Sequence, residues 1–200
     1  LGWEKQIKKL YVAADVQYRR HYDRFELFRD FQNKKPWYAD HNYHLTDVAG
    51  GSLHLEYTGK FGKIDAGVSS RYDHIYSTVL GSVITDTLKH PVNHFEKGMN
   101  KKFNKEADRV LNTAYLDYSK GLGAFYFSAG TSFSHTRKYG LKHHWGADLS
   151  YVPNQHWTVY TSINTASRLP TFTDLYYQNA THISNPELKP ESSLTSEAGV

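Results

Sequence analysis

The sequence contains no cysteine, a single methionine and no long hydrophobic run, and each absence excludes a class of protein. Without cysteine there is neither a disulfide framework nor a thiolate metal site. No apolar run approaches the roughly 20 residues that a transmembrane helix needs, and residues 1–10 lack the apolar core of a signal peptide. We therefore expect the chain to begin inside a longer protein or after processing.

Basic residues are not concentrated in any one segment, which argues against nucleic-acid binding. The formal net charge is +4, but the 24 lysines and arginines are interspersed with 20 acidic residues. A nucleic-acid interface shows a basic patch or stripe, whereas a mixed distribution is typical of a solvated surface. No nucleic acid is therefore expected among the partners.

Aromatic residues are abundant, and they favour strands over helices. Sixteen Tyr, ten Phe and four Trp make up 15% of the chain, and such residues are enriched in strands. The low mean hydropathy of −0.66 does not exclude a membrane location. A transmembrane barrel needs lipid-facing residues only at every second position of each strand.

Apolar and polar residues alternate with period two over about eight segments, each of which predicts a half-buried strand. Such strands, at about 10 to 14 residues, are long enough to cross a bilayer at a tilt. The segments are residues 10–18, 53–58, 64–73, 110–118, 125–134, 145–151, 157–164 and 194–200.

The connections between these segments alternate in length. Loops longer than about 15 residues are uncommon in compact soluble domains, whereas outer-membrane barrels alternate short periplasmic turns with long extracellular loops. We therefore predict an all-β fold, an antiparallel up-and-down transmembrane β-barrel, with residues 1–200 forming part of one β-barrel domain. It is a partial barrel of about eight strands with long extracellular loops. The tight turns lie near residues 59–62, 119–123 and 153–155, the long connections near 20–47, 77–107 and 169–191, and a shorter one near 136–142.

Aromatic residues flank the tight turns. Tyr57, Tyr118 and Tyr151 stand just before the three turns, and Trp157 stands just after one of them. Amphipathic rings at both membrane interfaces form the girdles of transmembrane barrels. The alternative is that these side chains cap the core of a soluble β-sandwich, which leaves the long loops unexplained.

The last long connection carries recognisable turn chemistry. Pro170 forces Leu169 out of helical geometry and ends the preceding strand. Thr171 and Asp174 have the spacing that caps a short helical turn. The Asn185–Pro186 pair then predicts a turn that delivers the chain into the next strand.

The segments "SRLPTFTDLYY" and "SNPELKPESSLTSEAGV" resemble a motif pair in the β-barrels of TonB-dependent outer-membrane receptors. The pair falls at the predicted strand–loop–strand position, and Ser184 stands where the family often has Gly. The matching residues are Arg168, Pro170, Thr171, Phe172, Asp174, Leu175, Tyr176, Asn185, Pro186, Leu188, Lys189, Pro190, Glu191, Glu197 and Gly199.

This resemblance implies energy-coupled uptake of a scarce, bulky solute across the outer membrane of a Gram-negative bacterium. The solutes of the family are iron chelates, cobalamin and other corrinoids, haem and oligosaccharides, and we prefer a metal chelate or corrinoid. The implied partners are the TonB protein, bound through an N-terminal box, and outer-membrane lipid; no cofactor is implied. The implied barrel has about 22 strands and an N-terminal plug. We expect the plug, box and remaining strands to lie outside these residues.

A non-transporting structural or adhesive outer-membrane β-barrel protein is the alternative function, and an upstream plug domain would discriminate against it.

An enzyme is not expected. Ser52 and His54 lie on one face of a strand, but no acid completes a relay with them. An isolated slice of barrel would also leave two unpaired edges and an apolar outer face, so we predict that it pairs edge to edge with another copy, closes into a smaller barrel or needs detergent.

Loop residues are the candidates for ligand contact. The aromatic residues Trp37, Tyr38 and Tyr43 could stack on a sugar or corrin or merely pack the loop, and we favour packing. Histidines in or near the predicted external loops are a second set, although no fixed spacing supplies the converging donors of a metal site. They are His90, His94, His143 and His144.

Polar residues of the strands are expected to face the lumen and to form a salt-bridge network there, rather than to contact the substrate. They are His54, Glu56, Asp65, Arg71, Asp117 and Asp148.

Overall fold

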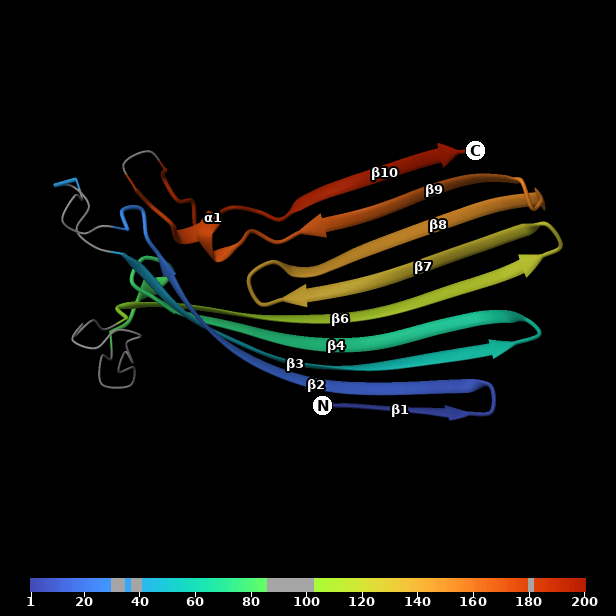
Figure 1. Cartoon of the computed structure of the whole chain (residues 1–200), viewed down its shortest axis with the longest axis horizontal. Coiled ribbons are helices and arrows are strands. Elements are labelled where there is room, and N and C mark those ends of the chain that lie inside the picture. Colours follow the sequence, from blue (N-terminus) through green and yellow to red (C-terminus); the bar gives the residue numbers. More distant parts are fainter. Residues whose placement is uncertain (30–34, 37–40, 86–102, 180–181) are drawn as a thin grey trace.

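Each long strand pairs with its neighbours in the sequence, in a single antiparallel sheet of ten strands (Figure 1). The computed structural model describes residues 1–29, 35–36, 41–85, 103–179 and 182–200. The strands are β1 (Gly2–Ile7), β2 (Leu10–Phe25), β3 (Asn42–Gly59), β4 (Gly62–Ser77), β5 (Ser82–Val83), β6 (Lys105–Leu122), β7 (Phe125–Thr136), β8 (Gly140–Asn154), β9 (Trp157–Arg168) and β10 (Glu191–Gly199). The predicted all-β antiparallel fold is confirmed.

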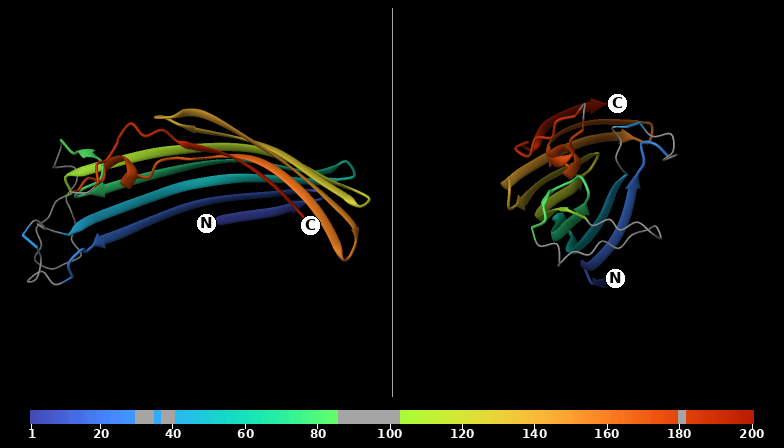
Figure 2. Two further views of the ribbon diagram at one scale, coloured as in Figure 1. Left: turned by 90° about the horizontal axis from the view of Figure 1, so that it is seen from above. Right: turned by 90° about the vertical axis from the view of Figure 1, so that its left-hand side faces the viewer.

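The sheet bends into an open arc, with the short helix α1 (Phe172–Tyr176) on its inner, concave side (Figure 2). The strand order is β1-β2-β3-β4-β6-β7-β8-β9-β10, and the small strand β5 pairs with β6. β1 and β10 are the edges of the sheet in the described part of the chain. The edge-to-edge self-association of the chain stays a prediction.

The structure has two strands more than the alternation predicted. β1 pairs with β2 from Gly2↔Asp15 to Ile7↔Leu10, but Lys5 interrupts the apolar positions Trp3 and Ile7, so the alternation is not visible. β5 has only two residues, Ser82 and Val83, too few to show a period. The strands β2, β3, β4 and β6 are also longer than expected, at 16 to 18 residues.

Short turns and longer connections lie at opposite ends of the sheet (Figure 1). Gly123, in the turn between β6 and β7, has a φ of 59°, a conformation that glycine adopts without strain. The predicted alternation is therefore confirmed, apart from the brief connection between β7 and β8. The short turns are residues 8–9, 60–61, 123–124 and 155–156, and the connections at the other end are 26–41, 78–104, 137–139 and 169–190.

The two faces of the sheet differ in chemistry. On the convex face, Leu53, Val68 and Ala114 lie side by side in register, and Val68 is 53% exposed. Their sequence neighbours Ser52, Ser69 and Thr113 are also paired in register and lie on the concave face. Because successive side chains of a strand point to opposite faces, this register gives an apolar outside and a polar inside.

The predicted aromatic residues lie on the convex face next to the short turns. Tyr57 is 43% exposed, Tyr151 39% and Trp157 59%. Tyr118 donates a hydrogen bond of 2.5 Å from its hydroxyl to the carbonyl of Phe61 in the adjacent turn. The arrangement matches that of a girdle, and nothing in the described sheet covers these rings as a sandwich core would.

The buried core is small and lies at the end with the long connections. Ile75 on β4, Leu80 and Ala107 on β6 form a buried cluster, against which Phe172 and Tyr176 of α1 pack. The helix therefore closes over the concave face at this end. Among the described residues, no helical segment has the length and apolar character needed to cross a membrane.

Helix α1 begins with the capping box that its sequence predicts. The Thr171 hydroxyl accepts a hydrogen bond of 3.1 Å from the Asp174 N–H, and the Asp174 carboxylate accepts one of 2.9 Å from the Thr171 N–H. These bonds satisfy main-chain donors that no helical carbonyl can reach. They hold the pKa of Asp174 below its ordinary value of 3.8, and nearby Arg168 adds to the effect.

The predicted turn at Asn185–Pro186 is also present. The Asn185 carbonyl accepts a hydrogen bond of 3.2 Å from the N–H of Leu188. The Asn185 side-chain oxygen accepts another, of 2.9 Å, from the N–H of Glu187. This side chain therefore fixes the turn that precedes β10.

We expect the convex face to contact lipid, so a charge placed there will destabilise the barrel. Val68→Arg should lower the free energy of unfolding by about 2–4 kcal/mol in a bilayer. Unfolding of the full-length protein in lipid vesicles, titrated with urea and followed by tryptophan fluorescence, measures the change. Ser69→Arg, on the concave face of the same strand, is the control and should cost much less. Equal costs would contradict a lipid-facing convex side.

Removal of the cap of α1 should loosen the β9–β10 connection while leaving the sheet intact. Thr171→Ala is expected to cost about 1 kcal/mol locally, because it deletes the hydroxyl that accepts the Asp174 N–H. Hydrogen–deuterium exchange of residues 171–177 should accelerate about fivefold. Thr173→Ala, within the same helix, serves as the control, and an equal acceleration in both variants would count against the capping role.

The cap should also weaken in acid. A carboxyl group with a lowered folded pKa contributes stability that is present above its unfolded pKa and is lost as the pH falls through the folded pKa. Protection of the α1 amides, corrected for intrinsic exchange rates, should therefore be constant from pH 7 to about pH 4 and then fall. Asp174→Asn should flatten this profile; a wild-type profile without the fall would refute the role of the carboxylate.

Candidate functional site

The concave face carries the polar residues that the sequence assigns to the lumen. Glu56 on β3, Asp65 on β4 and Asp117 on β6 are directly paired in register. His54 and Arg71 follow on the same face of β3 and β4. All six of the predicted residues, His54, Glu56, Asp65, Arg71, Asp117 and Asp148, lie on this face.

Lys63 connects the acidic residues into a network. Its ammonium group lies 3.0 Å from a carboxylate oxygen of Glu56 and 3.5 Å from one of Asp65. His54 approaches Asp65 through Nε2 at 3.8 Å, and its Nδ1 lies 2.6 Å from the Tyr115 hydroxyl. The expected salt-bridge network is therefore present for His54, Glu56 and Asp65. Arg71 pairs with Asp73 instead, and Asp148 accepts a hydrogen bond from Ser128.

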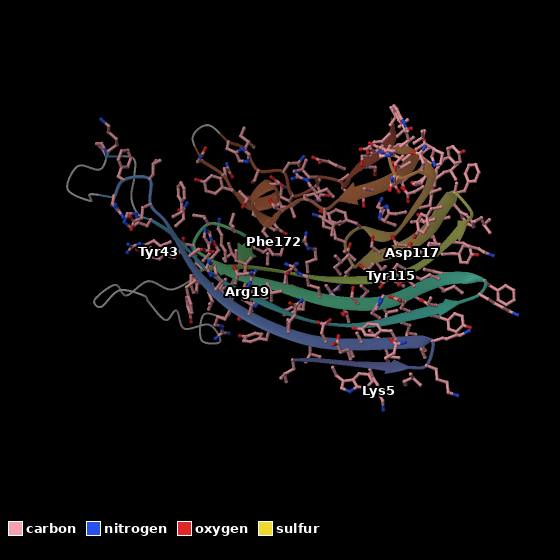
Figure 3. The ribbon with its side chains drawn as sticks, turned by 45° about the vertical axis from the view of Figure 1, so that its right-hand side comes forward. Lys5, Arg19, Tyr43, Tyr115, Asp117 and Phe172 are labelled. Carbon is pink, nitrogen blue, oxygen red and sulfur yellow. The ribbon has the colours of Figure 1, made fainter. Side chains whose placement is uncertain are left out.

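Two glycines make room for the longer side chains of the network. A Cβ atom at Gly67 would lie 2.5 Å from the ring of Tyr115, and one at Gly130 would lie 1.7 Å from a carboxylate oxygen of Asp117. Tyr115 and Asp117 therefore lean across neighbouring strands over glycines, and a larger residue there would have to displace these side chains. Both side chains project from the concave surface of β6 (Figure 3).

A polar hollow of about 530 Å³ lies beside this network, across β4, β6, β7, β8 and β9. Serine, aspartate and histidine side chains give it both donors and acceptors, and aromatic residues such as Tyr115 and Tyr126 add some apolar surface. The hollow therefore suits a polar ligand better than an apolar one. Its lining includes Lys63, Asp65, Asp117, Ser128, His144 and Asp148.

His54, Glu56 and Asp65 form a potential group of metal ligands within the described residues, with one donor atom of each within 4.8 Å of the others. The sequence shows no metal-ligand spacing here. The three side chains come from two different strands, β3 and β4, and lie close together only because those strands are paired in this register. Lys63 already lies between the two carboxylates. As it stands, the group is an ion-pair network.

Ser52 and His54 do not form a catalytic pair. The Ser52 hydroxyl donates to Asp15 on β2, whereas the His54 ring bonds in the opposite direction, to Tyr115 on β6. A nucleophile needs a base within hydrogen-bond reach, and each of these groups has another partner.

The motif residues hold the β9–β10 connection together. Arg168, the last residue of β9, places Nε 3.2 Å from Glu191, the first residue of β10, and lies 4.0 Å from Asp174. Leu175 is 4% exposed beneath α1. Pro186 in the following turn accepts a hydrogen bond from Lys138 in the β7–β8 connection. Lys189 and Pro190 then lead directly into β10.

Arg109 on β6 secures α1 against the sheet, a role that the sequence does not reveal. Its Nη1 donates a hydrogen bond of 3.0 Å to the carbonyl of Pro170, and its guanidinium lies 5.2 Å from the centre of the Phe172 ring. Asp73 lies 3.5 Å from its Nη2 and also binds Arg71 at 2.7 Å. The only signal in the sequence is the position of Arg109 on the polar face of its strand.

The candidate ligand-contacting residues are placed in part. Tyr43, which we expected in a loop, lies in β3, where it is 2% exposed and its main chain bonds to Thr78. Its contact with a ligand stays a prediction. The other aromatic and histidine candidates lie outside the described residues; they are Trp37, Tyr38, His90 and His94.

Two histidines expected in or near an external loop lie within β8. His143 on the convex face stacks on Phe133, with ring centres 4.7 Å apart. His144 on the concave face bonds to Ser167 at 3.2 Å. They therefore lie near the connection 137–139 rather than in it, because backbone pairing with β7 extends to Gly140, whereas the alternation of β8 becomes visible only from Trp145.

Known proteins resemble this chain in sequence and in fold. The vitamin B12 transporter BtuB of Vibrio vulnificus (strain YJ016) is 36% identical over 62 residues, which are 31% of this chain and 10% of the transporter. The structure of a mutant ferric enterobactin receptor, PfeA from Pseudomonas aeruginosa, matches with a TM-score of 0.63 over 86% of this chain and 25% of that one, at 10% identity. The structural match supports the fold, and the chain spans only a tenth to a quarter of these proteins.

The sequence model of the TonB-dependent receptor-like β-barrel matches residues 1–200. This match covers the whole chain and agrees with the antiparallel sheet, the apolar convex face and the motif pair at the β9–β10 connection. The chain therefore belongs to the TonB-dependent receptor-like β-barrel family, a family of outer-membrane receptors and transporters rather than enzymes.

Proposed function

We propose that the chain is part of an outer-membrane receptor that imports a scarce, bulky solute with energy delivered by the TonB protein. The observation that carries the proposal is the family match over residues 1–200. The polar concave face supports it, because a transported solute needs a hydrated path inside the barrel.

The solute belongs to the class of iron chelates, corrinoids, haem or oligosaccharides, with a chelate or corrinoid preferred. The two relatives described above are named for vitamin B12 and for ferric enterobactin, one corrinoid and one iron chelate. Identity of 36% over 62 residues is too local to select between them.

TonB is the proposed energy-coupling partner, through a box outside these residues, and the location is the outer membrane of a Gram-negative bacterium. The apolar convex face, with Leu55, Val68 and Leu149 between 37% and 53% exposed, supports contact with outer-membrane lipid.

Uptake by cells tests the proposal directly. Cells that express the full-length protein should accumulate one of a panel of labelled solutes, namely ferric catecholate and ferric citrate chelates, cyanocobalamin, haem and a maltooligosaccharide. Accumulation should depend on TonB, because no energy source exists in the outer membrane itself.

Matched cells without TonB, and cells without the receptor, are the controls. If the protein sits in the outer membrane and no solute accumulates in a TonB-dependent manner, the transport proposal is wrong. That outcome would favour a structural or adhesive barrel instead.

A further inference from the structure

A second hollow, also of about 530 Å³, lies at the end of the sheet with the long connections and shares no lining residue with the polar hollow described above. It lies between β6, the connection 137–139 and α1. Cationic and aromatic side chains dominate its walls. They are Arg109, Arg137, Lys138, Tyr139, Phe172 and Tyr176.

Two polar atoms at this hollow are buried and have no hydrogen-bond partner among the described residues. They are Nε of Arg109 and the hydroxyl oxygen of Tyr139. Buried polar groups in native proteins are almost always hydrogen-bonded, so an exception calls for a specific explanation. Two donors without acceptors beside one cavity indicate a site for a ligand that accepts hydrogen bonds.

Arg109 is held in place for such a role. Its Nη1 donates to Pro170 and its Nη2 faces Asp73, while Nε–H is buried without a partner among the described residues. The ring of Phe172 lies against the guanidinium at 5.2 Å. A guanidinium fixed by its other nitrogens loses little conformational freedom when it binds a ligand.

Tyr139 is also suited to donate. Its phenol is protonated at neutral pH, and burial raises its pKa further. Its ring lies 5.5 Å from the ammonium group of Lys138. Arg109, Arg137 and Lys138 line the hollow with one acid, Asp108, and Asp73 lies behind Arg109, so the local charge is still net positive and favours an anion.

We infer that this hollow binds an anionic oxygen group, a carboxylate or phosphate, of the transported solute. Nε–H of Arg109 and O–H of Tyr139 donate to the anion, while Phe172 and Tyr176 pack against the apolar part that carries it. The inference rests on the proposed function for the origin of the ligand, whereas the anion site itself can be measured without transport.

Benzoate and benzamide test the inference, since they share a shape and differ in charge. Binding to the full-length protein in detergent, measured by saturation-transfer NMR with titration, should favour benzoate by about tenfold or more, because hydrogen bonds to charged groups are the stronger ones. Inorganic phosphate should displace benzoate if both anions use the site; failure to displace it would restrict the site to carboxylates and remove phosphate from the proposal.

Tyr139→Phe is the decisive variant. It should weaken benzoate binding about tenfold and leave benzamide binding unchanged. Its thermal stability should not fall, because the deleted hydroxyl has no hydrogen bond to lose within the described structure. A purely structural role for Tyr139 would leave the preference for benzoate intact and would overturn the inference.

Arg109→Gln should abolish the preference for benzoate, and Lys60→Gln, the same loss of charge in the turn at the opposite end of the sheet, should retain it. An equal effect of both variants, or equal binding of benzoate and benzamide to the wild type, would show only non-specific attraction and would refute the site. The uptake assay and the benzoate assay test different proposals, and their outcomes are independent. A receptor without TonB-dependent uptake can still discriminate benzoate from benzamide, and a transporter can fail to do so.

Discussion

Main-chain hydrogen bonding between neighbouring antiparallel strands is the constraint on which the rest of the structure depends. In lipid, an unpaired N–H or C=O group is costly, so each strand must be joined to its neighbours along its whole length. Pairing between successive strands from β2 to β9, with one irregularity between β8 and β9 near Tyr151, fixes the register. The register in turn decides which side chains share a face. The apolar convex side and the charged concave side are both consequences of that one alignment.

The same register assembles the concave network from residues that are distant in the chain. Glu56, Asp65 and Asp117 meet because three strands align at one level, and the glycines opposite the long side chains leave them space. At the other end of the sheet the alignment places Arg109 under Pro170. Local turn chemistry and long-range pairing therefore meet at the β9–β10 connection, where a capped helix is fixed to β6.

Period-two alternation was enough to predict the fold, the side on which the charged residues lie and the placement of the aromatic residues at the short turns. It failed where a strand is too short or its pattern is broken, as in β5 and around Lys5 of β1. It also placed His143 and His144 outside the strand that contains them. Capping residues predicted α1 because that signal is local. The roles of Arg109 and Tyr139 could not be predicted, because they depend on which segments pack together in three dimensions.

The β9–β10 connection is held at two places, by α1 near β9 and by the turn at Asn185 near β10. Because both ends are fixed, the length of the chain between them does not affect how the two strands pair. Arg109 fixes α1 to β6, and Lys138 reaches the turn from the β7–β8 connection. The chain between them can lengthen, shorten or change its composition without shifting the register of either strand. The sequence of this connection can therefore vary while the sheet that carries it stays the same.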